Sequence, residues 1–149
     1  MASPYPEGGP PSGAPGGKTS LGLDSNLGAM LCYIANIVCC LGIILSVVFL
    51  ITEKENRFVK FHALQSLFLF VVYAALAILV QIIGLVLRIA VGLILAGLMT
   101  WGLWAIVTLV VVILWVWAGI KAYSGQWYKL PGIGDLAWNI VNKNTSTNQ

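Results

Sequence analysis

A histidine and a glutamine stand where a long apolar segment begins, and they are the side chains best suited to chemistry. His62 and Gln65 are three residues apart, so they share one face of a helix. A histidine can act as a general acid or base, but the sequence supplies no catalytic partner and no HExxH, GxSxG or P-loop pattern. We predict that both side chains pin helix ends through hydrogen bonds. A pH-sensitive or partner-binding role is the alternative.

The three cysteines, Cys32, Cys39 and Cys40, lie in one apolar run. An odd number of thiols in a lipid-embedded segment does not form a disulfide framework. Copper(I) binding by Cys39 and Cys40 is one alternative, because thiolates suit soft metals. Adjacent side chains on a helix point about 100° apart, which disfavours that site. We interpret the cysteines as packing residues and expect no metal and no cofactor.

Other polar groups are scarce inside the apolar runs. Asn36 lies well within the first run, where its amide needs a partner; an interhelical hydrogen bond is expected, and a pathway role is the alternative. An intramembrane enzyme needs a nucleophile–base pair or paired carboxylates at membrane depth. All the carboxylates fall outside the apolar runs, at Glu7, Asp24, Glu53, Glu55 and Asp135. We therefore expect no catalytic residues and no enzymatic activity.

The composition favours lipid as the main solvent of the chain. Of its 149 residues, 59% are hydrophobic and 9% are charged, with a mean hydropathy of +0.92. A soluble domain has about 25% charged residues, so this chain could not cover a soluble surface. Its net charge of +3 is too small and too scattered for a nucleic-acid footprint.

The apolar runs predict an all-α integral membrane protein: a three-helix transmembrane bundle with a short amphipathic C-terminal helix. Each run can cross a hydrocarbon core of about 30 Å. The expected transmembrane domain is 24–141, with spans at 27–51, 61–84 and 98–121. Residues 85–97 are expected to form a turn or an interfacial piece, and 131–141 a helix lying on the membrane. Residues 1–23, rich in Pro and Gly, and 142–149 are expected to be loose tails.

Small residues follow one face of the first predicted span at helical spacing. They are Gly28, Cys32, Ala35, Cys39, Gly42 and Ser46. Such stripes let helices approach closely in lipid. A similar stripe runs along the second span from Ala63 to Gly84. We predict that these faces meet each other, the third span or a second copy of the chain.

Basic residues give the expected orientation. With three spans, the 52–60 loop and the C-terminal segment share a side that carries six Lys and Arg residues, against Lys18 and Arg88 on the other. The positive-inside rule then places the loop and the C-terminus in the cytoplasm and the N-terminus outside. Lys121 can snorkel from the third span. The lack of a targeting segment favours a multi-pass protein of the bacterial inner membrane.

Two segments of the chain resemble a widespread bacterial family of small membrane proteins. The stretch KENRFVKFHALQS at 54–66 is similar to the family's charged loop and F-V-x-F-H-A-x-Q-A helix start. The stretch AGIKAYSGQWYKLP at 118–131, with Lys121, Tyr128 and Pro131, is similar to its A-x-K-A-x-x-G-x-x-Y-x-x-P ending. The family is grouped with Tic20-like proteins of the chloroplast inner-envelope translocon and with MamF-type magnetosome membrane proteins. The resemblance covers about residues 24–138.

The resemblance implies two functions. MamF-like relatives imply a structural or accessory membrane protein, membrane-organising, which self-associates and presents a cytoplasmic surface to partners. Tic20-like relatives imply a subunit of a translocation or conducting complex, which needs a polar path; its candidates are Asn36, Gln81, Thr100 and Thr108. The expected partners are the lipid bilayer and further copies or other membrane proteins, with no nucleic acid. The candidate partner or packing residues are His62, Gln65, Asn36, Gly28, Cys32, Cys39, Gly42, Ser46, Lys121, Tyr128 and Pro131.

Overall fold

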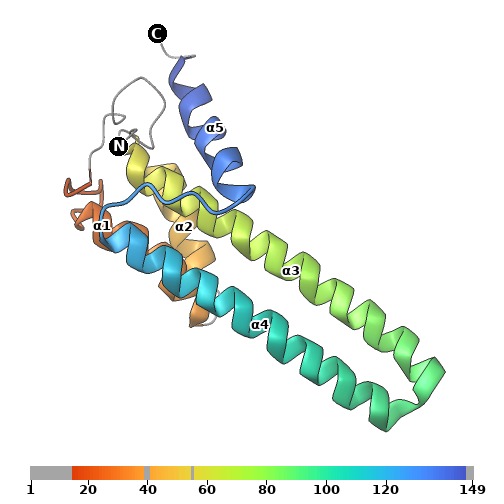
Figure 1. Ribbon diagram of the computed structural model, residues 1–149. Helices are drawn as coiled ribbons and strands as arrows, with labels where there is room; N and C mark the ends of the chain where they lie inside the picture. Colours follow the sequence, from red (N-terminus) through yellow and green to blue (C-terminus); the bar gives the residue numbers. More distant parts are fainter. Residues whose placement is uncertain (1–14, 39–40, 55, 147–149) are drawn as a thin grey trace, which may run out of the picture.

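The computed structural model describes residues 15–38, 41–54 and 56–146. In these residues the secondary structure is helical, apart from one isolated bridge between Lys18 and Asp24. The helices are α1 (Ser25–Ile37), α2 (Leu41–Thr52), α3 (Arg57–Val91), α4 (Leu93–Tyr123) and α5 (Ile133–Ser146). Figure 1 shows α3 and α4 as a long pair, with α1, α2 and α5 gathered around one end of it, which we call the base.

The α3–α4 pair is a helical hairpin that turns on a single residue. Its helices contain 35 and 31 residues, and they are the described helices long and apolar enough to cross a membrane. Gly92 alone connects them, with a φ of 85° that favours glycine. Residues 85–97, expected to form a turn or an interfacial piece, instead belong to the two helices on either side of this glycine.

The first predicted span, 27–51, is not one helix. It is divided into α1, of 13 residues, and α2, of 12, with Val38 ending α1. At 1.5 Å per residue each is about 20 Å long or less, too short to cross a bilayer core alone. Gly42 explains how the chain doubles back, because a Cβ there would lie 2.5 Å from Cγ of Asn36. Residues 27–51 are therefore not the single helix that was expected, and the three-helix transmembrane bundle is not confirmed.

Both ends of the α1–α2 hairpin lie at the base. Before α1, the backbone N–H of Ser20 donates to a carboxylate oxygen of Glu53 at 2.7 Å, just after α2. The side chain of Asn56 donates to the hydroxyl of Ser25. Groups in hydrogen-bond contact cannot lie on opposite sides of a bilayer about 30 Å thick. The structure therefore brings the N-terminal segment and the 52–60 loop to one end of the molecule, and their expected placement on opposite sides of a membrane is not confirmed.

The terminal segments also differ from the expected loose tails. Residues 15–24 form turns in which Thr19 is buried, while residues 1–14 lie outside the described part. At the other end, α5 starts at Ile133 and continues to Ser146, beyond the expected end at 141. Its Ala137 and Val141 are buried at the base, whereas Leu136 is 51% exposed. Part of its apolar face thus packs on protein.

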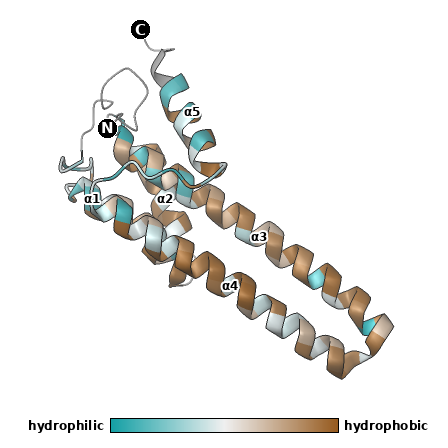
Figure 2. Ribbon diagram, viewed as in Figure 1, coloured by the Kyte–Doolittle hydropathy of each residue, from teal (hydrophilic) through white to brown (hydrophobic). Residues whose placement is uncertain are grey.

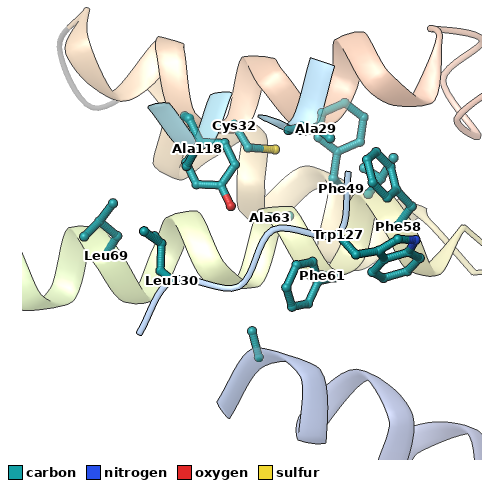
Figure 3. Close-up of a cluster of buried hydrophobic side chains, with 14 of the residues drawn as sticks. Ala29, Cys32, Phe49, Phe58, Phe61, Ala63, Leu69, Ala118, Trp127 and Leu130 are labelled. Atoms are coloured by element: carbon teal, nitrogen blue, oxygen red, sulfur yellow. The ribbon is translucent and has the colours of Figure 1, made fainter. Parts of the chain in front are cut away.

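The hydrophobic core lies where α1, α2, α3 and α4 meet the segment 126–130 (Figure 3). Its large aromatic members include Tyr33, Phe49, Phe58, Phe61 and Trp127. Figure 2 shows that hydrophilic residues concentrate around this end, whereas the outer part of the α3–α4 hairpin is mostly hydrophobic. The base thus combines a packed aromatic core with most of the polar residues.

Candidate functional site

The densest polar arrangement at the base joins Tyr33 of α1 to His62 and Gln65 of α3. All three side chains are fully buried. His62 and Gln65 lie one turn apart on α3, so both face the same neighbours. The Tyr33 hydroxyl lies between them, 3.1 Å from Nδ1 of His62 and 2.9 Å from Nε2 of Gln65. We call these residues the His62 network.

The acceptors around the network fix where its protons lie. Nε2 of His62 is 3.1 Å from the backbone carbonyl oxygen of Gln126, which can only accept, so Nε2 carries the proton. Nδ1 then accepts from the Tyr33 hydroxyl, and that hydroxyl accepts from Nε2 of Gln65. The imidazole in this arrangement is neutral, and both of its nitrogens are used.

The network holds an irregular segment, 126–130, against the bundle. Gln65 donates to the carbonyl oxygen of Tyr128 at 3.1 Å and accepts from the N–H of Leu130 at 3.3 Å. With the bond from His62 to Gln126, three backbone groups of this segment are paired by two side chains. Buried backbone groups outside a helix need such partners. The network therefore fastens the segment that leads from α4 into α5.

Aromatic rings enclose the histidine. The ring centroids of Phe58 and Phe61 lie 4.6 and 5.0 Å from that of His62, both in edge-to-face geometry. Trp127 packs on the same two phenylalanines, at 5.2 and 5.5 Å. Trp138 of α5 contacts Trp127 and Phe61 in turn. These rings exclude water and couple α5 to the network.

A second polar cluster surrounds Asn36 at the end of α1. Its Nδ2 donates to the Ser66 hydroxyl at 2.8 Å and to the Cys32 carbonyl oxygen at 3.1 Å. The Ser66 hydroxyl donates to the same carbonyl oxygen at 2.6 Å. Asn36 therefore makes an interhelical hydrogen bond, as expected, and this bond links α1 to α3. Its Oδ1 has no partner among the described residues.

The small-residue stripe of the first predicted span folds onto itself. Gly28 of α1 faces Phe49 of α2, whose ring would lie 3.3 Å from a Cβ at the glycine. At the other end, Gly42 of α2 faces Asn36. Cys32 and Ser46 are fully buried between these two contacts. The stripe thus forms the seam of the α1–α2 hairpin, and at Cys32 it also meets Ser66 of α3.

The remaining candidates have separate positions. Lys121 places its ammonium group over the Trp117 ring, 5.3 Å from the centroid. The side chain of Tyr128 packs against the core, and Pro131 is exposed just before α5. Cys39 and Cys40 lie outside the described residues, so the packing of Cys39 and a copper site with Cys40 stay predictions.

The four residues expected to line a polar path do not share one surface. Asn36 bonds α1 to α3, and the Thr100 hydroxyl donates to the Ala96 carbonyl oxygen within α4. Thr108 pairs with Tyr73 at 3.3 Å between α3 and α4. Gln81 is exposed on α3. Three of the four are therefore used for packing within or between helices.

Tyr33 and the contacts at the ends of the α1–α2 hairpin were not predicted from the sequence. A tyrosine hydroxyl in an apolar run needs a hydrogen-bond partner, and that signal alone marks Tyr33. Glu53 and Asn56 were treated as a solvated loop, but both are buried and bonded to residues before or at the start of α1. Their partners lie more than thirty residues away, where no local pattern reveals them.

The site as a whole holds parts of the chain together. Each polar atom of the His62 network is directed at another group of the protein rather than at an open pocket. Within the described residues, no group of three or more His, Cys, Asp or Glu side chains could hold a metal ion. What this arrangement can do chemically is fix the geometry of the base.

Comparison with known proteins identifies relatives across most of the chain. Residues 24–141 match the magnetosome magnetite crystal formation protein family. A membrane protein of Methanocaldococcus jannaschii is 43% identical over 121 residues, 81% of this chain and 92% of the relative. A membrane protein of Archaeoglobus fulgidus is 40% identical over 97 residues, 65% of this chain and 82% of the relative. No solved structure matches the chain.

These matches confirm the expected MamF-like resemblance, whereas the link to the chloroplast translocon and a bacterial source stay predictions. The relatives named above are archaeal membrane proteins. The matched region begins at the residue that caps α1, Asp24, and ends at a residue of α5 buried at the base, Val141. It therefore contains both helical hairpins and the His62 network. The chain belongs to the magnetosome magnetite crystal formation protein family of membrane proteins.

Proposed function

We propose that this protein is a small structural or accessory membrane protein that self-associates and presents its base to partners in the cytoplasm. The observation that carries the proposal is the division of the molecule into an apolar hairpin and a polar, internally bonded base (Figure 2). The hairpin anchors the protein in lipid. The base gives partners a surface of fixed geometry, which the His62 network holds in place.

Charge supports the cytoplasmic assignment of the base. Arg88 lies near the tip of the hairpin, and the other seven of the eight basic residues lie toward the base. The positive-inside rule favours the side with more Lys and Arg as cytoplasmic. In this proposal the N-terminal segment joins the C-terminus inside, because Ser20 is bonded to Glu53. The chain then crosses the bilayer twice, through α3 and α4, and the α1–α2 hairpin enters it from the base.

Topology mapping tests the orientation. A reporter active only in the cytoplasm, fused in separate proteins to the N-terminus and to the C-terminus, is expected to be active at both ends. A reporter active only outside is expected to be silent at both. Opposite signals at the two ends would contradict two crossings and would instead indicate an odd number of spans.

Self-association is tested on the purified protein. Native mass spectrometry of the tagged protein in mild detergent is expected to show multiples of this chain alone. A single copy would contradict self-association. Stoichiometric secretion or import subunits would instead favour the alternative function, a subunit of a translocation complex, and conductance in liposomes would then be measured.

A further inference from the structure

The outer half of the α3–α4 hairpin, which we define as residues 75–107, is largely uncovered by the rest of the described chain. Within it only Val80, Gly84, Ala96 and Thr100 are buried. Gly84 and Thr100 contact each other across the hairpin, since a Cβ at Gly84 would lie 2.7 Å from the Thr100 hydroxyl oxygen. Lipid or another protein must therefore cover most of this surface.

Gln81 is a neutral polar residue on the outward side of the outer half, where most other exposed side chains are apolar. Its side chain is exposed, and no hydrogen bond joins its amide to any part of the chain that the structure describes. By contrast, the amide of Gln65 near the base makes three hydrogen bonds. The two glutamines lie on the same helix, but only the lower one finds its partners within the chain.

The tip of the hairpin shows that Gln81 lies at membrane depth. Ile89, Leu93 and Ile94 are 86%, 72% and 82% exposed. Such side chains are stable against hydrocarbon, so in the proposed two-crossing topology the tip lies in the far leaflet. Gln81 precedes Gly92 by eleven residues, about 16 Å of helix. Its amide is therefore inside the hydrocarbon region.

Arg88 and Gln81 differ in what they can do at that depth. Arg88 is nearer the tip, and its long side chain can snorkel to the headgroups. The shorter glutamine does not reach them. Acyl chains offer no donor or acceptor, so an amide left unpaired among them is strongly destabilising. The amide of Gln81 therefore calls for a protein partner.

The direction of Gln81 leaves room for such a partner beside the hairpin. Gly84 faces α4, and Gln81 precedes it by three residues. The side chain of Gln81 therefore points about 60° away from the direction of α4. Ile83 is turned about 100° the other way, toward the opposite flank. Ala63 lies five turns before Gln81 in the same direction and is fully buried. The side of α3 that carries Ala63 and Gln81, which we call its flank, is thus covered by protein near the base but exposed at Gln81.

The chemistry of an amide favours one occupant, a second copy of this chain. A primary amide carries both donors and an acceptor, so it is its own complement. Copies inserted in one orientation hold Gln81 at one depth, and a two-fold axis along the membrane normal brings like residues together. Two Gln81 side chains then satisfy each other without any ionised group.

We propose that Gln81 is the centre of a homodimer interface, in which the open flanks of two α3–α4 hairpins pack together and the two amides hydrogen-bond. This inference rests on the self-association in the proposed function and names its surface. The Arg88 side chain of each copy lies about two turns further out, within reach of the headgroups by snorkelling.

Cross-linking in native membranes tests the location of the interface. The three cysteines are first replaced by alanine, and single cysteines are then introduced as Gln81→Cys or Ile83→Cys. Mild oxidation is expected to give a disulfide-linked dimer at least about tenfold faster at 81 than at 83, because only 81 faces its copy. Equal rates at the two positions, or no dimer at 81, would overturn the proposal.

Dimerisation of otherwise native chains tests the role of the amide. In liposomes, Gln81→Leu is expected to weaken dimerisation roughly tenfold, because it removes the hydrogen bonds between the two amides. Gln81→Asn keeps an amide and is expected to retain part of the affinity. Ile83→Val is the matched control and is expected to change nothing. Photobleaching of labelled chains counts the copies.

The outcomes separate this interface from self-association itself. If the native chain forms dimers and Gln81→Leu dimerises equally well, self-association stands and this interface is wrong. If the native chain is monomeric at every protein-to-lipid ratio, both proposals fall. Unchanged thermal unfolding of Gln81→Leu monomers excludes a folding defect as the cause of any loss.

Discussion

The two halves of α3 differ in whether their polar side chains find hydrogen-bond partners within the chain. Near the base, residues 58–66 are almost all buried, and His62, Gln65 and Ser66 find partners in α1 and in the segment 126–130. In the outer half, most side chains are exposed and apolar, and Gln81 finds no partner in the described chain. One helix thus contains a region that folds by internal hydrogen bonds and a region that depends on its surroundings. The difference teaches that polar residues in an apolar helix have different roles according to what covers them.

The sharpest test of the base is Gln65→Ala, for which we expect the largest loss of stability. The substitution removes three hydrogen bonds and leaves two backbone groups of the segment 126–130, the Tyr128 carbonyl oxygen and the Leu130 N–H, without their partner. Unpaired buried groups cost about 1–3 kcal/mol each, so a total loss of about 3 kcal/mol is expected. Unfolding of the purified protein in mixed detergent measures it.

Gln126→Ala is the matched control for that experiment. The side chain of Gln126 is exposed, and the network uses only its backbone carbonyl oxygen. Its effect is expected to stay within about 0.5 kcal/mol. If the two variants were equally stable, the network would not be what fastens the segment 126–130.

The seam of the α1–α2 hairpin can be broken with one methyl group. In Gly42→Ala the new Cβ would lie 2.5 Å from Cγ of Asn36 and 2.6 Å from its backbone nitrogen. Overpacking of this kind costs about 1–3 kcal/mol. Gly102→Ala serves as the control, because no atom lies within 4 Å of its Cβ position. Stability is measured by the same unfolding assay, and a neutral Gly42→Ala would show that α2 can separate from α1.

A double-mutant cycle sharpens the comparison in the outer half. Gly84→Ala would place a Cβ 2.7 Å from the Thr100 hydroxyl oxygen and 2.8 Å from its methyl carbon. We expect a loss of about 1–2 kcal/mol, which Thr100→Ala should largely reverse by removing both atoms. Additive effects of the two substitutions would mean that α3 and α4 do not meet at this level.

The smallest effect is expected at the surface of the base. Lys129 and Asp135 form a salt bridge of 3.2 Å, with side chains 32% and 70% exposed. Exposed pairs contribute about 0–1 kcal/mol and are screened by salt. Asp135→Asn should therefore change stability little, and any change should vanish at high ionic strength. A large, salt-independent loss would reveal a role in packing α5 instead.

The membrane class and the helices could be predicted from the sequence because hydropathy and length are local properties. The run at 27–51 is long and apolar enough to predict a span, but hydropathy does not record that the chain turns back after Val38. That reversal depends on the fit of Gly42 against Asn36 and on bonds from Ser20 to Glu53. These contacts join residues that a periodicity argument treats separately.

The candidate site was predictable in part for the same reason. His62 and Gln65 stand out as polar residues at the start of an apolar helix, and they do lie side by side in the structure. Their partner Tyr33 could not be found from spacing, because it comes from a helix about thirty residues earlier. Gln81 was recognised as polar, but its direction on α3 follows only from the contact between Gly84 and Thr100.

The one-residue turn at Gly92 has a consequence for how the protein enters the membrane. α4 begins immediately after α3 ends, so no hydrophilic loop has to be carried across the bilayer. Neither helix can cross the bilayer far ahead of the other, because the connection between them at the tip is too short. In the proposed topology the two helices would therefore enter lipid together, from the side of the base. A protease added to the opposite side would find no connecting loop to cut.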